Sequence, residues 1–383
     1  MMRRLSLVIS ITSLCVCLLP GVSPAADVTG LTVRNVDTVR YVPATDGRKH
    51  LEFDLLITNG AQTEATLREV VVRVGRKVML RLSAGELATS THSIAVGVRT
   101  PTRKIPPASS VITMVDLKLS GPARDLPRRL TSTVKYGVAP GPLSNIIDRH
   151  RITIGTAVDR KVPISVAPPL RGSGWFGLNA CCVPTAPHRS GILAVNNRLT
   201  MVETFAIDYV KVVDGSLTRG DGTRVTDFYG YGQPIHNVAR GKVVAVHKGL
   251  PDAPFPPGPN PSVRSSDDYT GNSVMVRLAP HTFALYAHLK PGSIRVRKGQ
   301  RLRRGQVIGR LGNSGNSTGP HLHFSLQVTS NPFSRGVPFV FDRFRLQGTG
   351  TIDPETGEVH IRRSPRPARS TYPLDGAVAT FNR

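Results

Sequence analysis

The chain has 383 residues, a hydrophobic fraction of 39% and a formal net charge of +25 at pH 7. This length predicts two domains rather than one, and the hydrophobic fraction is sufficient for packed cores, which excludes a wholly disordered chain. Four cysteines are too few for a disulfide-stabilised scaffold. The positive charge predicts contact with a polyanion, for which nucleic acid, an anionic membrane surface and an acidic cell-wall polymer are the candidates.

The first 25 residues have the layout of a secretory signal peptide. Arg3 and Arg4 precede the apolar run 5–19, and small residues at 23–25 offer a cleavage site. The apolar run is shorter than the roughly 20 residues that span a bilayer, so we interpret residues 1–25 as a cleaved signal. Export to the periplasm, the extracellular space or the cell wall argues against a specific nucleic-acid partner and favours an anionic cell-wall or membrane surface.

Residues 27–165 are predicted to form a β-sandwich. Short alternating apolar segments, such as 51–57 and 111–117, are separated by turn-forming residues. Strands at this spacing are typical of an antiparallel sandwich, here of immunoglobulin-like type. The sequence suggests no cluster of histidine, cysteine and carboxylate side chains in this part, and His50 and His92 are interpreted as exposed. We therefore expect an accessory domain that acts as a spacer or docks on the cell wall.

The remainder of the chain follows a Pro- and Gly-rich junction at 163–174. Residues 175–345 are again rich in strand-forming sequence, so the fold class is expected to be all-β. Residues 346–383 are interpreted as a basic C-terminal tail, whose arginines between 362 and 369 bind a polyanion or are simply solvated.

The candidate chemistry lies close to residue 320. His321 and His323 open a predicted strand after a Gly-rich segment, and residues i and i+2 of a strand point to the same face. Histidine is a frequent metal ligand and the usual proton carrier near pH 7. A third histidine, His288, and Asp208 at the end of an apolar run complete a set that suits zinc.

These residues lie in segments that resemble the lysostaphin-like (LytM-type) zinc endopeptidases, which cut peptides of peptidoglycan. The matching segments occur in the family's order between residues 200 and 328, under half of the chain. They include Phe205-Ala-Ile-Asp208, Tyr286-Ala-His-Leu289 and the segment 312–324, which ends in His-Leu-His-Phe. The resemblance implies a β-rich catalytic core with one zinc ion, and it does not extend to the N-terminal sandwich.

By position, the resemblance implies that Asp208 and His323 are zinc ligands and that His288 and His321 are the catalytic pair. Zinc with three protein ligands keeps a position for water and lowers the pKa of that water toward ~7. His321 would accept the proton of this water as general base, and His288 would hydrogen-bond the tetrahedral oxyanion or protonate the leaving amine. The expected activity is hydrolysis of peptide bonds in peptidoglycan stem peptides or cross-bridges.

The chain departs from the family pattern at one zinc ligand. The family has a histidine four residues before the aspartate, where this chain has Thr204. Either another residue supplies the ligand, or the domain has lost its metal and is a zinc-less, non-enzymatic regulator or cell-wall-binding protein. His188 is the preferred substitute, and His236 and Glu203 are the other candidate donors.

The orientation of His188 depends on the register of a predicted hairpin around residues 196–197. A three-residue turn places His188 opposite Thr204, whereas a two-residue turn places Arg189 there and points His188 away. A bulge near Gly191 would restore the first arrangement. The sequence is compatible with either register.

Two further features have alternative interpretations. Cys181 and Cys182, the cysteines that remain after signal cleavage, are expected to form a thiol pair or a vicinal disulfide rather than to bind metal. The segments 298–300 and 305–309 also suit a lipoyl-type carrier domain, but no lysine stands at a hairpin tip of the carrier kind. No pattern in the sequence indicates an oligomeric state or the peptide bond that is cleaved.

Overall fold

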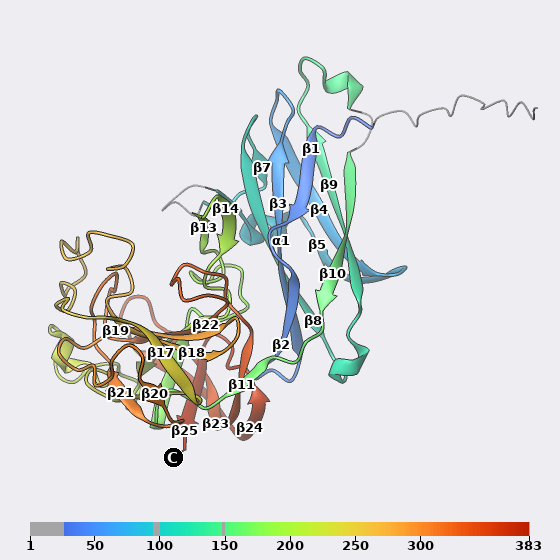
Figure 1. The fold of residues 1–383 in the computed structure, drawn as a ribbon. Coiled ribbons are helices and arrows are strands. Elements are labelled where there is room, and N and C mark those ends of the chain that lie inside the picture. Colours follow the sequence, from blue (N-terminus) through green and yellow to red (C-terminus); the bar gives the residue numbers. More distant parts are fainter. Residues whose placement is uncertain (1–26, 95–99, 148–149, 383) are drawn as a thin grey trace, which may run out of the picture.

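The computed structural model describes residues 27–94, 100–147 and 150–382, so the expected signal peptide lies outside the described residues. Two large sheets account for most of the structure, the first from the N-terminal part of the chain and the second from the C-terminal part (Figure 1). Strands dominate both parts and helices are short, which confirms the all-β prediction. No helix in these three described ranges is both long enough and apolar enough to cross a membrane.

The first sheet contains ten strands, and one short helix, α1 (Ala84–Ser90), follows β5. In the order in which the strands pair, they are β5 (Lys77–Leu82), β4 (Ala65–Val74), β9 (Arg129–Val138), β10 (Arg151–Asp159), β2 (Val39–Pro43), β3 (Lys49–Asn59), β8 (Ser110–Leu119) and β6 (Thr91–Ser93), with β1 (Leu31–Asn35) on β3 and β7 (Lys104–Ile105) on β4. Among the described residues, short 3-10 turns lie in this part at Ala123–Asp125 and Ser144–Ile146, and another lies in the C-terminal part at Val225–Asp227.

This first sheet folds over on itself as a sandwich. β10 joins β2 through a parallel ladder of only two residue pairs, and the other pairings in the described part of the sheet are antiparallel. Phe53 and Val115 from one side of this junction share a buried core with Val70 and Val134 from the other side. Two layers with one apolar face each are stabilised by packing those faces together. The immunoglobulin-like type of this sandwich remains a prediction.

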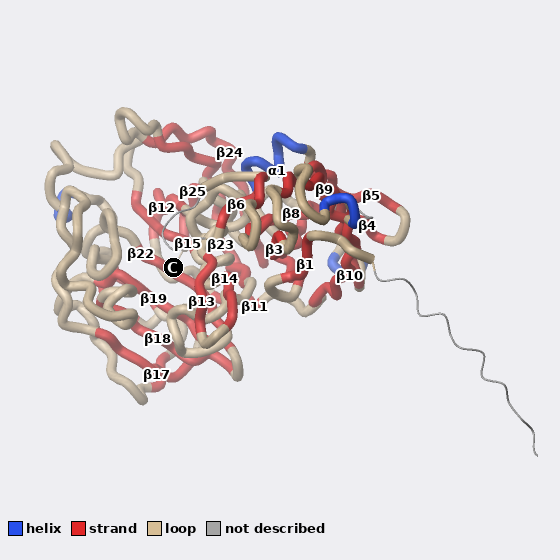
Figure 2. Tube along the Cα trace, turned by 90° about the horizontal axis from the view of Figure 1, so that it is seen from above, coloured by secondary structure: helices blue, strands red, loops and turns tan. Residues whose placement is uncertain are grey.

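The second sheet contains eleven strands and holds the candidate site near its middle. In pairing order they are β11 (Ile164–Val166), β23 (Phe339–Ile352), β25 (Ala377–Phe381), β12 (Gly172–Leu178), β15 (Ile207–Lys211), β22 (Leu322–Gln327), β19 (Thr282–Leu289), β18 (Asn272–Ala279), β17 (Gly241–His247) and β20 (Arg301–Leu302), with β24 (Val359–Thr371) on β23. Two small sheets accompany it, β13 (Ile192–Val195) with β14 (Arg198–Met201) and β16 (Pro234–His236) with β21 (Val307–Arg310). The β13–β14 hairpin lies between the two parts of the chain in both views (Figures 1 and 2).

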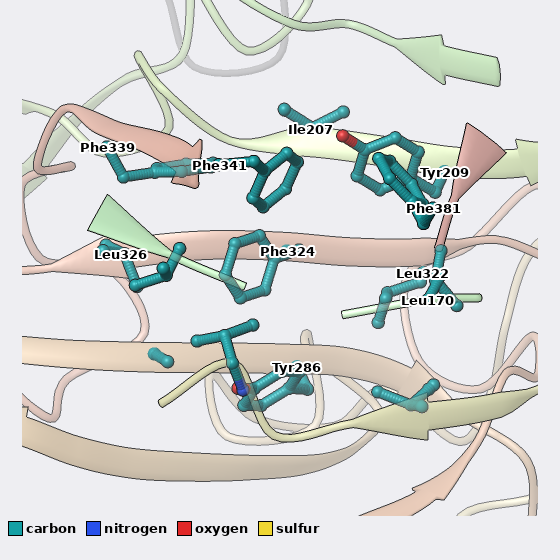
Figure 3. Packing of buried hydrophobic residues seen from close by; sticks show 14 of the residues in the cluster. Leu170, Ile207, Tyr209, Tyr286, Leu322, Phe324, Leu326, Phe339, Phe341 and Phe381 are labelled. Carbon is teal, nitrogen blue, oxygen red and sulfur yellow. The ribbon is translucent and has the colours of Figure 1, made fainter. Parts of the chain in front are cut away.

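The core of the second sheet lies against one face of its central strands. Tyr209 of β15, Phe324 of β22 and Tyr286 of β19 point into it and meet Phe341 and Phe381 from the C-terminal strands (Figure 3). Side chains alternate between the two faces of a strand. The residues next to Tyr209 and Phe324 therefore point to the opposite face of the same strands.

The end of β23 and the strands β24 and β25 lie within the segment 346–383, which was interpreted as a basic tail, and they belong to this sheet. β25 pairs with both β12 and β23 and buries Phe381 in the core. β24 pairs with β23 at the edge of the sheet and contains Pro365 and Pro367. An edge strand tolerates proline because one side of its backbone needs no partner, so a basic, Pro-containing sequence is compatible with a strand here.

The two sheets are docked through backbone and side-chain contacts. The backbone N–H of Tyr372 donates to the Pro43 carbonyl (2.8 Å), and the N–H of Thr45 donates to the Tyr372 carbonyl (3.0 Å). An ion pair joins Arg335 to Asp37 with Nη1 and Oδ1 3.0 Å apart. The N-terminal sheet is therefore attached to the part of the chain that carries the candidate site.

Candidate metal centre

Asp208 and His323 lie on neighbouring strands at the middle of the second sheet. They are directly paired residues of β15 and β22, and the Asp208 Oδ1 is 3.0 Å from the His323 Nδ1. Their chain neighbours Ile207 and Tyr209, and Leu322 and Phe324, point into the hydrophobic core (Figure 3). Strand alternation therefore directs the carboxylate and the imidazole together to the other face.

His188 reaches the same place from a loop. Its Nε2 is 3.2 Å from the Asp208 Oδ2, and one ligand atom each from His188, Asp208 and His323 lie within 4.8 Å of one another. All three residues are buried. The structure thus brings together the three residues that the sequence analysis names as zinc ligands.

The hairpin has the two-residue turn, yet His188 does not point away. Val195 pairs with Arg198 across residues 196–197, but the ladder of β13 and β14 ends at Ile192 and Met201. Residues 186–191 then form successive turns, with N–H groups at 189 and 190 donating to the Ala186 carbonyl. The expectation that a two-residue turn points His188 away fails, because it assumes that the strand continues through residues 186–191.

Thr204, at the position of the family's missing ligand, lies elsewhere. It sits in a turn closed by the Ala206 N–H and the Glu203 carbonyl. It lines a small cavity against the N-terminal sheet, together with Glu52 and Asp54 of β3. The two other candidate donors, His236 and Glu203, are both outside the cluster. His236 lies on β16, where its Nδ1 donates to the Gly305 carbonyl (3.0 Å).

Hydrogen bonds define which ring nitrogen of His188 faces the centre. Its Nδ1 is 3.2 Å from the Ala206 carbonyl oxygen, and a carbonyl only accepts, so Nδ1 carries a proton in this contact. The Nε2 atom is then the nitrogen that faces Asp208. A second contact holds the carboxylate, because the Asn179 side-chain amide donates to the Asp208 Oδ2 (2.8 Å). Such contacts orient metal ligands before a metal binds.

The electrostatics of the centre favour an ionised carboxylate. Burial raises the pKa of Asp208, but the charges of His188 and His321 outweigh it and hold that pKa well below its usual range. Burial lowers the pKa of His188, but the charge and hydrogen bond of Asp208 raise it to about 9 overall. The buried carboxylate attracts positive charge strongly. Together with the two imidazoles of His188 and His323, it forms a donor set suited to a divalent metal.

His288 and His321 flank the three donors. Their ring centroids are 4.7 Å apart, and the His288 ring is 6.0 Å from that of His323. The His321 Nε2 lies 3.5 Å from the Asp208 Oδ1. Both Nδ1 atoms donate to backbone carbonyls, His321 to residue 319 and His288 to residue 314, each at 2.8 Å. In this arrangement the His321 Nε2 faces the centre, and Nε2 is the remaining ring nitrogen of His288.

The backbone around His288 is specialised. His288 is the penultimate residue of β19 and has φ +61°, a left-handed conformation that L residues seldom adopt. Burial lowers the pKa of His288 well below its usual value, and the neighbouring rings of His321 and His323 lower it further. A buried, neutral imidazole held in an unusual backbone conformation is typical of a functional position rather than of packing.

The glycines of the motif allow the carbonyl of Ser314 to reach His288. A Cβ on Gly271 (φ +64°) would lie 2.3 Å from the Ser314 oxygen, and one on Gly315 (φ +79°) would lie 2.3 Å from the Gly271 nitrogen. Two loops from distant parts of the chain therefore approach more closely than side chains permit. Gly315 lies in the motif segment 312–324, but the sequence does not identify Asn179, Ala206 or the Ser314 carbonyl as contacts of the site.

A second group of potential donors lies in the N-terminal sheet and was not expected from the sequence. His50, Glu52 and Asp116 approach Cys182 with their ligand atoms within 4.8 Å of one another. The Cys182 sulfur, however, is bonded to Cys181 in a vicinal disulfide, so it offers no thiolate. This leaves the group less suited to a metal than the His188 cluster.

His50 is buried, contrary to the expectation of an exposed histidine. Its Nδ1 is 2.9 Å from the Asp116 Oδ1, and its Nε2 is 3.1 Å from the Asp46 Oδ2. Burial lowers the pKa of His50, but the hydrogen bond and charge of Asp116 raise it overall. Both ring nitrogens are therefore engaged with carboxylates. His92 is also buried, in β6.

Comparison with known proteins identifies the region that carries His288, His321 and His323, whereas His188 and Asp208 lie before the matched residues. Residues 223–335 match Peptidase family M23. A 64-residue segment is 45% identical to the peptidoglycan DD-endopeptidase ShyA of Vibrio cholerae and covers 17% of this chain and 14% of that protein. A 71-residue segment is 42% identical to the DD-carboxypeptidase/endopeptidase Mpg of Neisseria meningitidis and covers 18% of this chain and 16% of that protein. The chain thus matches less than a fifth of the length of these relatives.

Solved structures of peptidases also align with the chain. The catalytic domain of the prophage-encoded M23 protein EnpA from Enterococcus faecalis aligns with a TM-score of 0.27 and 22% identity over 45% of this chain and 93% of that domain. The catalytic domain of lysostaphin from Staphylococcus simulans aligns with a TM-score of 0.23 and 21% identity over 38% of this chain and 80% of that domain. The sequence matches confirm the resemblance to the M23 (LytM-type) peptidase family over residues 223–335.

Proposed function

We propose that this protein is an exported zinc metallo-endopeptidase that hydrolyses peptide bonds in the stem peptides or cross-bridges of peptidoglycan. The observation that carries the proposal is the group of three buried donors, His188, Asp208 and His323, with His288 and His321 beside it. The name of the similar protein from Vibrio cholerae, a peptidoglycan DD-endopeptidase, supports peptidoglycan as the substrate, and the name of the protein from Neisseria meningitidis supports endopeptidase activity.

The donor set fits zinc. His188 would bind through Nε2, His323 through Nδ1, and Asp208 through a carboxylate oxygen, which gives three protein ligands of the types that catalytic zinc sites use. When bound, zinc lowers the pKa of a water molecule toward ~7 and polarises a carbonyl. The Ala206 carbonyl and the Asn179 amide hold His188 and Asp208 in position for the metal.

His321 is proposed as the general base. Its Nδ1–H is committed to the Gly319 carbonyl, so its Nε2 has a free lone pair directed at the centre. It accepts the proton of the attacking water at this atom. The same Nε2, once protonated, is able to return the proton to the leaving amine.

His288 is proposed to act on the substrate side of the reaction. Its Nδ1–H donates to the Ser314 carbonyl, so its Nε2 donates a hydrogen bond only after it gains a proton. Burial keeps the ring neutral at rest. A proton that Nε2 receives from the attacking water, directly or through His321, is therefore held weakly and passes readily to the leaving amine or to an oxyanion.

The basic surface is proposed to hold the enzyme on an anionic cell-wall or membrane surface. Arg343 and Arg369 are directly opposed residues of β23 and β24, and both are exposed, as are Arg345 and Arg362. Like charges opposite each other destabilise a sheet unless an anion screens them. This edge hairpin is therefore a reasonable contact for a phosphate- or carboxylate-bearing polymer.

A zinc-less regulator or wall-binding protein is the alternative, because Thr204 replaces a family ligand. The position of His188 beside Asp208 argues against it. Metal analysis and digestion of isolated peptidoglycan by the purified full chain separate the two. We expect about one zinc per chain and release of peptide fragments, both lost in His323→Ala. Zinc-free protein without hydrolysis at neutral pH, in parent and variant alike, would establish the regulator.

A further inference from the structure

The ligand His188 has no strand to hold it. Asp208 and His323 are fixed by the hydrogen-bonded ladders of β15 and β22, whereas His188 lies in the turns of residues 186–191. Its own ring makes one backbone contact, with the Ala206 carbonyl. A loop ligand needs further anchoring, because a displacement of about 1 Å is enough to spoil a site of this kind.

The next residue, Arg189, supplies an anchor of unusual strength. Its side chain is 1% exposed and extends across the interface into the N-terminal sheet. The guanidinium donates to the carboxylates of Glu52 and Asp54, the latter at 2.6 Å, and to the carbonyls of Phe53 (3.2 Å) and Val115 (3.5 Å). These contacts engage all three nitrogens of the guanidinium fork.

Glu52 and Asp54 are arranged to receive this arginine. They are residues i and i+2 of β3, so they share the face opposite the sandwich core, and both are buried. Two buried carboxylates without a cation would be strongly unfavourable, and so would a buried guanidinium without carboxylates. The N-terminal sheet and the loop of residues 186–191 are therefore electrostatically complementary, and each is incomplete alone.

We propose that Arg189 is a positioning residue that places His188 in the metal centre, so that the N-terminal sheet completes the zinc site of the peptidase domain. The inference rests on the proposed function, because it assumes that His188 is a ligand. His188 and Arg189 are consecutive and extend in opposite directions, one to Asp208 and the other to Glu52 and Asp54. Fixing the arginine therefore fixes the backbone from which the imidazole projects.

The test measures the zinc dissociation constant of the full chain by competition with a chelator. Arg189→Lys keeps the buried charge but loses the planar fork. The triple variant Arg189→Met/Glu52→Gln/Asp54→Asn removes the anchor and the buried charges together, which avoids unpaired carboxylates. Arg335→Met is the matched control, because it breaks another ion pair between the sheets, with Asp37, and leaves the contacts of Arg189 with Glu52 and Asp54 in place.

Both Arg189 variants should bind zinc about 10- to 100-fold more weakly than the parent, the usual effect of losing a group that orients a ligand. The control should bind like the parent. The visible absorption of the cobalt-substituted protein should change in the Arg189 variants, because one ligand is displaced, and circular dichroism should show that they remain folded. If one variant does not fold, the other carries the test.

Zinc affinity and cobalt spectra equal to the parent in folded Arg189 variants would overturn the inference. An equal loss of affinity in Arg335→Met would also overturn it, because any weakening of the interface would then suffice. A His188→Ala variant separates this failure from failure of the proposed function. Undiminished zinc binding in His188→Ala contradicts the ligand assignment itself, whereas loss in His188→Ala with normal binding in the Arg189 variants contradicts only the positioning role.

Discussion

Replacing His188 by alanine should remove most of the affinity for zinc. Structural zinc sites bind with about 10–16 kcal/mol of apparent free energy, shared among four ligands. One imidazole then corresponds to about 3–4 kcal/mol, or roughly a 10²- to 10³-fold increase in Kd. The His188 Nε2 lies 3.2 Å from the Asp208 carboxylate in a buried site. A water molecule that replaced this ligand would have to enter the buried site, which costs free energy.

Chelator competition on the purified full chain measures this change directly. His236→Ala is a matched control, because His236 is also buried and lies in the same part of the chain, but its ring is bound to the Gly305 carbonyl outside the donor cluster. The control should retain the zinc affinity of the parent. Circular dichroism of both metal-free variants checks that each is folded.

Three outcomes would refute this reasoning. Parent-like affinity in His188→Ala would mean that the imidazole is not a ligand. Loss of affinity in His236→Ala, with His188→Ala unaffected, would move the third ligand to β16. Restored binding in the double variant His188→Ala/Thr204→His would mean that Thr204 faces the metal, whereas it lines the interface cavity against β3.

Three further predictions concern the catalytic pair, the basic edge and the buried histidine of the N-terminal sheet. His288→Ala should bind zinc like the parent but lose about 10²- to 10⁴-fold in the rate of peptidoglycan hydrolysis; loss of zinc would instead identify His288 as a ligand. Arg343→Ser/Arg369→Ser should bind isolated cell wall more weakly at low salt and equal the parent at high salt, where charges are screened; salt-independent binding contradicts the basic-edge contact. Burial lowers the pKa of His50, but Asp116 raises it above 6.5 overall. Protonation of His50 therefore stabilises the fold fully below pH 6.5, and this stabilisation is lost as the pH rises through the folded-state pKa. The melting temperature of the parent should therefore fall more steeply above pH 6.5 than that of His50→Gln, and parallel curves would contradict this.

The strand-borne part of the site was predictable from the sequence. His321 and His323 are two residues apart at the start of β22, and Asp208 lies between two core residues of β15. Alternation of side chains along a strand is enough to place such residues on one face. The family motifs then related the two strands, which local patterns alone do not do.

The loop-borne part was not predictable in the same way. The orientation of His188 depends on turns at 186–191, which no periodic pattern encodes. Its anchor, Arg189, depends on Glu52 and Asp54, which are more than 130 residues away in the sequence. In β3 these two acidic residues alternate with apolar residues, a pattern that predicts an ordinary solvent-exposed face. Only the structure shows that Arg189 covers this face. His50 was misjudged for the same reason, because the chain that buries it is distant in sequence.

The arginine-rich C-terminal segment was wrongly interpreted as a tail, because its basic, Pro-containing composition is not typical of a strand that pairs in a sheet. β24 exposes most of its side chains and contains two prolines, both compatible with an edge strand. β25 is short, but it lies between β23 and β12 and contributes Phe381 to the core. A strand that is stabilised mainly by its neighbours in the sheet shows only a weak strand pattern in its own sequence.

X-ray absorption spectroscopy of the zinc-loaded protein, or its crystal structure, tests the central claim most directly. The account predicts one zinc ion with nitrogen ligands from His188 and His323 and an oxygen ligand from Asp208, at about 2.0–2.2 Å, and a nitrogen count that falls by one in His188→Ala. Zinc held instead by His50 and Asp116, or an unchanged first coordination shell in His188→Ala, would contradict it.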